Sequence, residues 1–322
     1  MELKKIATLI KRSRKIAIVG HVNPDGDCIG SVTALLQAIR KSGRECYMYL
    51  DAPVPRYIEY LMKPDYVTDV DRDYDLCIAL DCADRSRVAD GKGIFENEPK
   101  TASIDHHITN THFADVNYVD SNASATGEII YEFLTKYLKV KLDTHIASSI
   151  YSAISSDTGN FKFANTKART HIIASKLMDY DVDIAEINRQ IFDTHSLDQI
   201  ALMGEFSSGL KTHHDGKVIV GKLTYEMVEK HNLTFEDTDY LVSIPRSVEG
   251  CEVGVFMKVK SDDEIKVSLR SNGDADVSKV ASVFGGGGHV RASGATFNCS
   301  YDEAIEKVLN EIAKELKICI ME

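Results

Sequence analysis

Acidic and histidine residues stand at the ends of three short apolar runs in the first half of the chain. The tripeptide Asp105-His106-His107, after the run 101–104, is the densest of these clusters. Each run is typical of a buried strand. Carboxylates and imidazoles converge from separate strand ends only if something cationic holds them together, because a buried charge needs a partner or a metal. The sequence therefore predicts a two-metal site at one edge of a sheet. The other two junctions are His21 to Asp27 after 15–20, and Asp81 after 76–80.

Apolar strand candidates alternate with helical stretches through this half, which is the pattern of a mostly parallel sheet covered by helices. The expected strands are 16–20, 45–50, 76–80 and 102–104, and the expected helices are 29–42, 125–137, 144–155 and 167–180. A fourth acid, Asp157, follows the third of these helices. Ligands of open α/β sheets bind outside the carboxyl ends of the strands, and the three clusters lie at such ends.

The second half has a different order of elements. Residues 182–211 are expected to be helical and to connect two domains. Strands are expected at 217–223, 251–260, 264–270 and 292–297, with helices at 277–284 and near the C-terminus. The fold class is thus α/β, with an N-terminal mostly parallel sheet with flanking helices at 1–185, a helical linker at 186–212, and a smaller α+β domain at 213–322.

The loop after the first strand holds His21, Asp25 and Asp27 together with Pro24 and Gly26, which shape a compact turn. Hard carboxylates with imidazoles favour divalent ions such as Mn²⁺, Fe²⁺ or Co²⁺ over structural zinc. The alternative for this segment alone is a turn whose aspartates cap the next helix. Asp81 alone is equally well explained as a turn cap, but at a strand end it could also bridge two metals.

His106 and His107 cannot both point the same way on a strand, so one is expected to bind metal and the other to face a substrate. Asp105 offers the carboxylate that commonly orients a metal-binding histidine. A similar pair, His213-His214, precedes Asp215-Gly216 and is interpreted as an ordinary loop.

The run Gly285-Gly286-Gly287-Gly288 precedes His289 and leaves backbone N–H groups able to approach a phosphate closely. It is not a Walker loop, because no Gly-Lys-Ser/Thr follows, and a flexible turn is the alternative. His289, Arg291 and Arg270 nearby favour a phosphate or base clamp, since the guanidinium fork holds two phosphate oxygens at once.

Composition narrows the class of protein. A net charge of −11 over 322 residues argues against a groove for long nucleic acids, which needs many lysines and arginines. Seven cysteines without a CxxC pair fit neither a disulfide framework nor a zinc ribbon. No apolar run of membrane-spanning length and no secretory pattern is present, so we expect a cytoplasmic protein without membrane partners.

The ordered motifs His-x-x-x-Asp-x-Asp, Asp, Asp-His-His, Asp and Gly-Gly-Gly-Gly-His resemble those of the DHH phosphoesterase family with its DHH-associated C-terminal domain. The resemblance spans nearly the whole chain and is closest to members that degrade very short RNA (nano-RNA) and dephosphorylate 3′-phosphoadenosine 5′-phosphate (pAp). It implies a phosphoric ester hydrolase acting on short RNA and nucleotide bisphosphates. The alternatives are a phosphodiesterase for cyclic di-AMP or its linear product pApA, and a non-catalytic nucleotide-binding module.

The resemblance also implies roles for individual residues. One metal would be held by His21, Asp25 and Asp81, and the second by Asp27, Asp81, His106 and Asp157, with Asp81 as the bridge. His107 would face the scissile phosphate and Asp105 would orient the histidines. Two divalent ions are implied, with Mn²⁺ expected and Mg²⁺ or Co²⁺ as alternatives. The nucleotide would be gripped across an interdomain cleft by Gly285, Gly286, Gly287, Gly288, His289 and Arg270, and Arg291 is added for its nearness to that motif. A homodimer is left open.

Overall fold

The computed structural model describes residues 1–49, 54–63, 65–67, 73–89, 93–97 and 100–318. The chain forms two compact units, Met1–Thr194 and His195–Glu322. The division falls within the predicted linker 186–212. The predicted end of the second strand at residue 50 lies outside the described residues.

The first unit is built on a five-stranded sheet in the order β2-β1-β3-β4-β5, and every neighbouring pair is parallel. The strands are β1 (Lys15–Val19), β2 (Glu45–Tyr49), β3 (Leu76–Leu80), β4 (Thr101–Asp105) and β5 (Val116–Val119). The predicted parallel α/β architecture is confirmed, although β5 was not predicted. The strand order reverses between β1 and β3, and this switch point is where open α/β sheets bind ligands.

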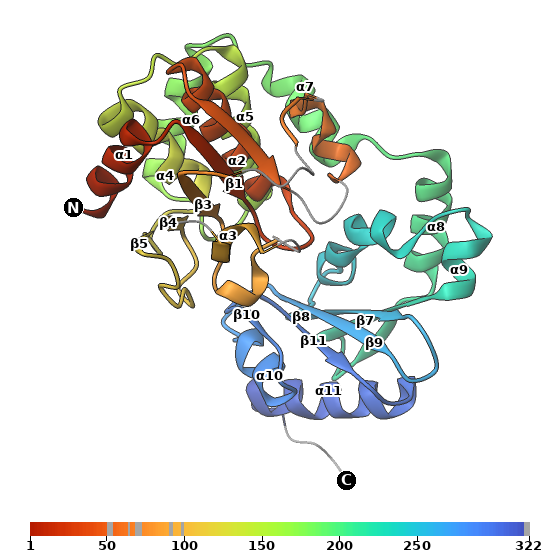
Figure 1. Ribbon diagram of the computed structural model, residues 1–322. Coiled ribbons are helices and arrows are strands. Elements are labelled where there is room, and N and C mark those ends of the chain that lie inside the picture. Colours follow the sequence, from red (N-terminus) through yellow and green to blue (C-terminus); the bar gives the residue numbers. More distant parts are fainter. Residues whose placement is uncertain (50–53, 64, 68–72, 90–92, 98–99, 319–322) are drawn as a thin grey trace. The chain divides into compact units, whose positions relative to one another are not determined.

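Helices cover this sheet (Figure 1). They are α1 (Glu2–Arg12), α2 (Gly26–Lys41), α3 (Ile94–Asn97), α4 (Thr126–Glu132), α5 (Thr144–Asp157), α6 (Ala168–Met178) and α7 (Ile184–Asn188), with short 3₁₀ or π segments η1 (Arg56–Leu61), η2 (Arg85–Arg87), η3 (Phe133–Leu138) and η4 (Arg189–Asp193). Helix α2 begins three residues before the predicted start at residue 29. The reason is Asp25, whose side chain accepts the N–H groups of Asp27 and Cys28 and so caps the helix earlier.

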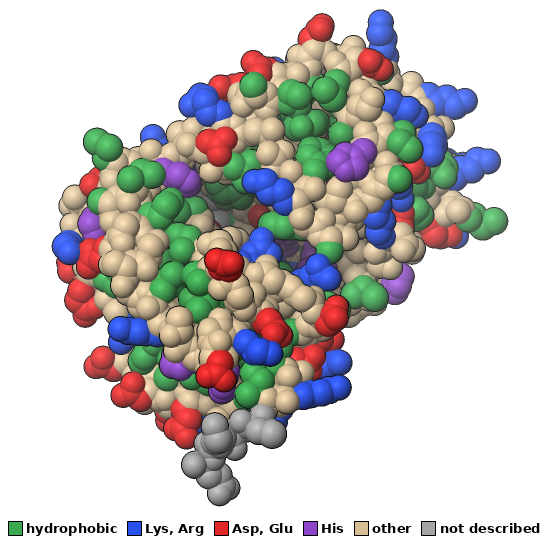
Figure 2. All heavy atoms as spheres, turned by 180° about the vertical axis from the view of Figure 1, so that it is seen from behind, with side chains coloured by type: hydrophobic (Ala, Val, Ile, Leu, Met, Phe, Trp, Pro, Cys, Tyr) green, Lys and Arg blue, Asp and Glu red, His purple; other side chains and the backbone are tan. Residues whose placement is uncertain are grey.

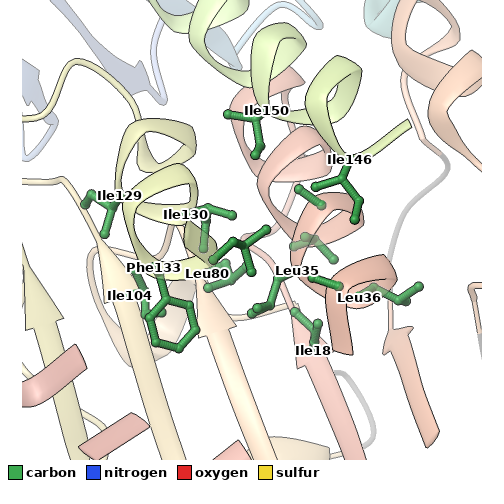
Figure 3. Close-up of a cluster of buried hydrophobic side chains, with 14 of the residues drawn as sticks. Ile18, Leu35, Leu36, Leu80, Ile104, Ile129, Ile130, Phe133, Ile146 and Ile150 are labelled. Carbon is green, nitrogen blue, oxygen red and sulfur yellow. The ribbon is translucent and has the colours of Figure 1, made fainter. Parts of the chain in front are cut away.

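The core of the first unit lies between the sheet and helices α2, α4 and α5 (Figure 3). Apolar side chains of the strands meet those of the helices, and the ones labelled in the figure are Ile18, Leu80, Ile104, Leu35, Leu36, Ile129, Ile130, Phe133, Ile146 and Ile150. Helices α2 and α5 approach closely at Gly30, where an added Cβ would lie 2.5 Å from the carbonyl oxygen of Ser149. This approach holds the N-terminal end of α2, and the loop before it, against α5.

We therefore expect Gly30→Ala to destabilise the first unit by about 1–3 kcal/mol, because the new methyl group overlaps a backbone atom that cannot rotate away. Gly204→Ala is the matched control, since Gly204 is a helical glycine with nothing within 4 Å of the added Cβ. It should be neutral or stabilising by about 0.5–1 kcal/mol through helix propensity. Thermal unfolding followed by circular dichroism measures both, and equal shifts in the two variants would contradict the close-packing explanation.

The second unit contains a six-stranded sheet in the order β10-β11-β9-β8-β7-β6. Its pairs are antiparallel except β7 with β8. The strands are β6 (Lys211–His213), β7 (Val218–Thr224), β8 (Val253–Val259), β9 (Ile265–Ser271), β10 (Gly287–His289) and β11 (Ala292–Phe297). The helices are α8 (Leu197–Ser208), α9 (Tyr225–Lys230), α10 (Val277–Val283) and α11 (Tyr301–Glu315). Two 3₁₀ segments are η5 (Phe235–Ser243) and η6 (Pro245–Ser247). The predicted α+β class is confirmed. The predicted helical connector 182–211 is interrupted between η4, which ends at Asp193, and α8, which begins at Leu197, and its last residue begins strand β6.

The two faces of this sheet have different coverings. On one face Val253, Val255 and Leu269 pack with α10 and α11 in one apolar cluster. On the other, Phe256 packs with Phe206 of α8 in a smaller cluster. The alternation along β8 is what separates the two clusters, because successive side chains of a strand point to opposite faces.

None of the helices in the described part of the chain combines the length and hydrophobicity that crossing a membrane requires. Both acidic and basic side chains occur on the face shown in Figure 2.

Candidate metal centre

The loop after β1 brings His21 and Asp25 to the carboxyl end of the sheet. His21 is 5% exposed, and its Nδ1 donates to the carbonyl oxygen of Val22 at 2.8 Å. Its Nε2 lies 3.6 Å from Asp25 Oδ1 and 3.6 Å from Asp81 Oδ2. Asp25 also caps α2, as the alternative interpretation of this segment predicted. The same carboxylate thus caps the helix and lies close to His21. The cap fixes the loop that presents His21.

Asp81 follows β3 in a left-handed backbone conformation, with φ at +59°. Its buried carboxylate lies near three imidazoles: Oδ2 is 3.6 Å from His21 Nε2, and Oδ1 is 3.6 Å from His106 Nε2 and 3.7 Å from His107 Nδ1. Thr126 Oγ1 donates to Oδ1 at 2.9 Å and fixes the carboxylate plane. A residue held in a sparsely populated conformation at a strand end is typical of functional sites. The two oxygens therefore face histidines of different segments, which fits the carboxylate that was predicted to be shared.

His106 lies among three acids. Its Nε2 is 3.6 Å from Asp81, 3.9 Å from Asp27 Oδ2 and 3.8 Å from Asp157 Oδ2. Asp27 is 1% exposed and accepts N–H groups of Thr126 and Gly127 at the start of α4, at 2.7 and 3.0 Å. The N-terminal end of α4 thereby fixes the Asp27 carboxylate, as helix N-termini do for anions.

His107 has a different environment from its neighbour. Its Nδ1 donates to Asp105 Oδ1 at 2.7 Å, and Asp105 itself is fully buried. Asn110 Nδ2 donates to the other oxygen, Asp105 Oδ2, at 2.7 Å. Burial alone would raise the pKa of Asp105. The hydrogen bond and charge of His107, together with the hydrogen bond of Asn110 and the charge of His106, outweigh burial and lower the pKa of Asp105. Asp105 is therefore an anion that orients His107.

Excess negative charge dominates the electrostatics of the cluster. Burial, together with the charges of Asp81 and Asp157, raises the pKa of Asp27 well above its usual range. Burial opposes protonation of His21 and His106, but the neighbouring carboxylates outweigh it and raise both pKa values, that of His21 to about 9. Without a cation these groups retain protons to offset one another. Divalent cations would replace those protons, so the donor set fits metal binding.

Among the residues that the structure describes, three groups of at least three His, Cys, Asp or Glu side chains have ligand atoms within 4.8 Å of one another. They are Asp27, His106 and Asp157; Asp81, His106 and His107; and His21, Cys28 and Asp81. Asp81 belongs to two of them, which agrees with a bridging position. Cys28 is fully buried, and burial raises its pKa well above the usual range, which disfavours the thiolate form that binds metals.

The sequence did not point to several residues that hold this cluster. Asn165 Nδ2 donates to the carbonyl oxygens of Ser124 and Asp157, both at 3.0 Å, and so ties the Asp157 segment to the loop before α4. Asn110 and Thr126 support Asp105 and Asp81 as described above. Asn110 and Asn165 lie in polar loops and Thr126 begins α4, and nothing in the residue pattern separates them from ordinary turn or helix-start residues.

The second unit carries the predicted nucleotide-binding residues. Arg270 lies on β9 and is partly buried, whereas His289 ends β10 and is exposed. Arg291 lies in the turn between β10 and β11, with an exposed side chain. The N–H groups of Gly285 and Gly286 donate to carbonyl oxygens of α10, at 3.1 and 3.0 Å. Gly287 and Gly288 lie in β10, where they are paired with Gly294 and Ser293 of β11.

The chain matches the DHH family, N-terminal domain, over residues 15–154 and the DHHA1 domain over residues 215–318. It belongs to the DHH family, in a form that combines the DHH domain with a C-terminal DHHA1 domain.

Its relatives include two proteins named bifunctional oligoribonuclease and PAP phosphatase NrnA. The one from Thermus thermophilus is 34% identical over 98% of this chain and 94% of its own length. The one from Bacillus subtilis is 31% identical over 91% of each. A cyclic-di-AMP phosphodiesterase, GdpP of Geobacillus thermodenitrificans, is 24% identical over 89% of this chain but 45% of its own length.

A solved structure with a similar fold is that of an exopolyphosphatase-related protein from Bacteroides fragilis. It is 25% identical, with a TM-score of 0.89, and the match covers 98% of this chain and 97% of that one.

Proposed function

We propose that this protein is a metal-dependent phosphoesterase that hydrolyses very short oligoribonucleotides to mononucleotides and dephosphorylates pAp. The observation that carries the proposal is Asp81, whose Oδ2 faces His21 while its Oδ1 faces His106 and His107, within a cluster of further acids. The relatives named NrnA support the substrate assignment, because their similarity extends over nearly the whole chain. A cytoplasmic location and a possible homodimer stay part of this proposal.

We assign one metal to His21, Asp25 and Asp81, and the second to Asp27, Asp81, His106 and Asp157. Mn²⁺ is the proposed ion, with Mg²⁺ or Co²⁺ as alternatives. When bound, such ions acidify water and offset negative charge on a phosphoryl oxygen. The chain's own contribution is to fix the ligands before substrate arrives, since the cap at Asp25 and the start of α4 already hold two of the acids.

His107 is proposed to act on the substrate directly. Its Nδ1 is held by Asp105, so the ring orientation is fixed, and we assign the substrate-facing role to Nε2. Burial opposes its protonation, but the hydrogen bond and charge of Asp105, with the charge of Asp81, raise its pKa. A histidine with a raised pKa can donate a hydrogen bond, or a proton, to the phosphate or the leaving oxygen. Asp105 acts through His107 and is a positioning residue.

Turnover of a panel of short substrates tests this proposal. With Mn²⁺, the purified protein should release mononucleotides from RNAs of two to five residues and phosphate from pAp. Chelation should abolish both reactions and added Mn²⁺ should restore them, because the acid cluster is the proposed metal site. Cyclic di-AMP and pApA in the same panel test the second candidate, which the lower identity to GdpP makes weaker. Preferential turnover of cyclic di-AMP would favour that alternative, and binding without turnover would favour a non-catalytic module.

A further inference from the structure

The loop before α4 and the first two residues of that helix form one segment, 120–127, which we name the α4 entry. It orients two proposed ligands of the second metal. The carbonyl oxygen of Ala123 accepts from His106 Nδ1 at 3.4 Å, which leaves Nε2 directed at the acids. The hydroxyl of Thr126 donates to Asp81 Oδ1 at 2.9 Å, and this is the carboxylate oxygen that faces His106.

The other two proposed ligands of the second metal depend on the α4 entry as well. Its two helical N–H groups hold the carboxylate of Asp27 at 2.7 and 3.0 Å. The carbonyl oxygen of Ser124 accepts from Asn165 Nδ2, which also donates to the carbonyl oxygen of Asp157. A shift of the α4 entry would therefore disturb the surroundings of all four ligands at once.

The start of helix α6 holds the α4 entry in place through a chain of buried hydroxyl groups. Ser124 Oγ donates to the carboxylate of Glu128, and it lies 2.9 Å from Thr170 Oγ1. Because a carboxylate only accepts, the proton of Ser124 is committed to Glu128, and Thr170 must donate to Ser124. Lys167 adds a further contact, since its Nζ donates to the carbonyl oxygen of Asn122 at 2.7 Å.

Arg169 joins both ends of the α4 entry. Its Nη1 donates to Asp120 Oδ2 at 2.7 Å, and its Nε lies 3.3 Å from Glu128 Oε2 and 3.5 Å from Glu132 Oε1. Asp120 begins the α4 entry and donates its backbone N–H to the carbonyl oxygen of Asp105 at 3.1 Å. Glu128 follows the last residue of the segment and is 1% exposed. Removing the guanidinium would leave this buried carboxylate without its paired cation, which is far more costly than losing a surface ion pair.

We propose that Arg169 and Thr170 are positioning residues that set the affinity of the second metal site. They act through the α4 entry, because its groups hold all four proposed ligands of that site. The first site should be much less sensitive, since the loop after β1 and the start of α2 hold His21 and Asp25. Groups that orient metal ligands typically contribute about 10- to 100-fold in metal affinity. This inference rests on the proposed function for the assignment of the ligands to two metals.

Titration of the metal-free full chain with Mn²⁺ tests the proposal without substrate, because the electron paramagnetic resonance signal of free Mn²⁺ reports how much is bound. The wild type should bind two Mn²⁺. Arg169→Gln should weaken one of the two by about 10- to 100-fold and leave the other unchanged. Thr170→Val, which removes one hydroxyl, should weaken the same Mn²⁺ by about 3- to 10-fold. Thr170→Ser keeps the hydroxyl and should bind both ions as the wild type does.

Arg40→Gln is the matched control. Arg40 also forms an ion pair within the first unit, with Asp65, and its side chain is 25% exposed compared with 32% for Arg169. It lies in the last turn of α2, roughly 20 Å along the helix from Asp27. Thermal unfolding of the metal-free variants measures the stability that each loses. Arg40→Gln should bind both Mn²⁺ as the wild type does, whatever stability it loses.

The two separate Mn²⁺ affinities decide the outcome. Wild-type affinity for both ions in Arg169→Gln, or an equal loss for both in a variant with a native circular dichroism spectrum, overturns the proposal. If Arg169→Gln does not fold, Thr170→Val decides in the same way. A wild type that binds fewer than two Mn²⁺ also overturns it.

Turnover of short RNA and pAp by the wild type, with excess Mn²⁺, reports the proposed function separately. If the wild type binds two Mn²⁺ but turns over neither substrate, the proposed function is wrong. Selective weakening of one Mn²⁺ in Arg169→Gln would still establish the positioning role in that case.

Discussion

Asp81→Asn is expected to lower kcat/KM for short RNA and pAp by at least about a thousandfold, and to remove bound Mn²⁺ at the same time. The change deletes one ligand oxygen and the charge of a carboxylate that faces both His21 and His106. Asparagine tolerates the left-handed backbone at this position, so the effect measures the carboxylate and not the turn. Metal content by mass spectrometry and initial rates with excess Mn²⁺ give the two readouts.

Asp179→Asn is the matched control for this experiment. Asp179 is an exposed aspartate after α6, so losing its charge should leave the rate and the metal content unchanged. Wild-type activity in Asp81→Asn, with wild-type Mn²⁺ content, would reject Asp81 as a bridging ligand.

His107→Gln is expected to separate chemistry from metal binding. Removing the imidazole should lower kcat by about 10²–10⁴, the usual contribution of a positioned acid or base. Bound Mn²⁺ should remain close to the wild-type amount, because the other donors around Asp81 and His106 are untouched. The distinction follows from geometry, since His107 Nδ1 is held by Asp105 whereas His106 Nε2 lies among three acids.

The matched control is His112→Asn, at an exposed histidine in the same loop. Asparagine tolerates the left-handed backbone of this position, where φ is +54°. Its rate should equal that of the wild type, because the side chain lies outside the acid cluster. A His107→Gln protein that loses its Mn²⁺ would instead assign His107 to the metal, as the grouping of Asp81, His106 and His107 allows.

Much of the first unit could be predicted from sequence because parallel strands are buried on both faces. Such strands appear as continuous apolar runs, and the run 76–80 coincides with β3. Once the strand ends are known, the parallel arrangement alone brings Asp81 and Asp105 to the same edge. Strand β5 was missed because its four residues are only half-buried and show no apolar run.

The parts that could not be predicted depend on contacts between distant segments. Arg246 follows Pro245 in a short irregular stretch, and only its close approach to Gly254, which is paired with Arg270, places it near that residue. Asn165 contacts Ser124, which is 41 residues earlier in the chain. Periodicity and local motifs carry no information about such pairs, since each partner alone has an ordinary sequence context.

The glycine run of the second unit has a role in the backbone that is independent of any ligand. Gly285 has φ at +73°, and Gly286 lies so close to β11 that an added Cβ would come 2.1 Å from the carbonyl oxygen of Gly294. These two glycines end α10 and begin the hairpin, so a related chain would keep them even after losing all affinity for nucleotides. In a diverged relative, a retained glycine run would therefore indicate only that the hairpin is retained, and would say nothing about nucleotide binding.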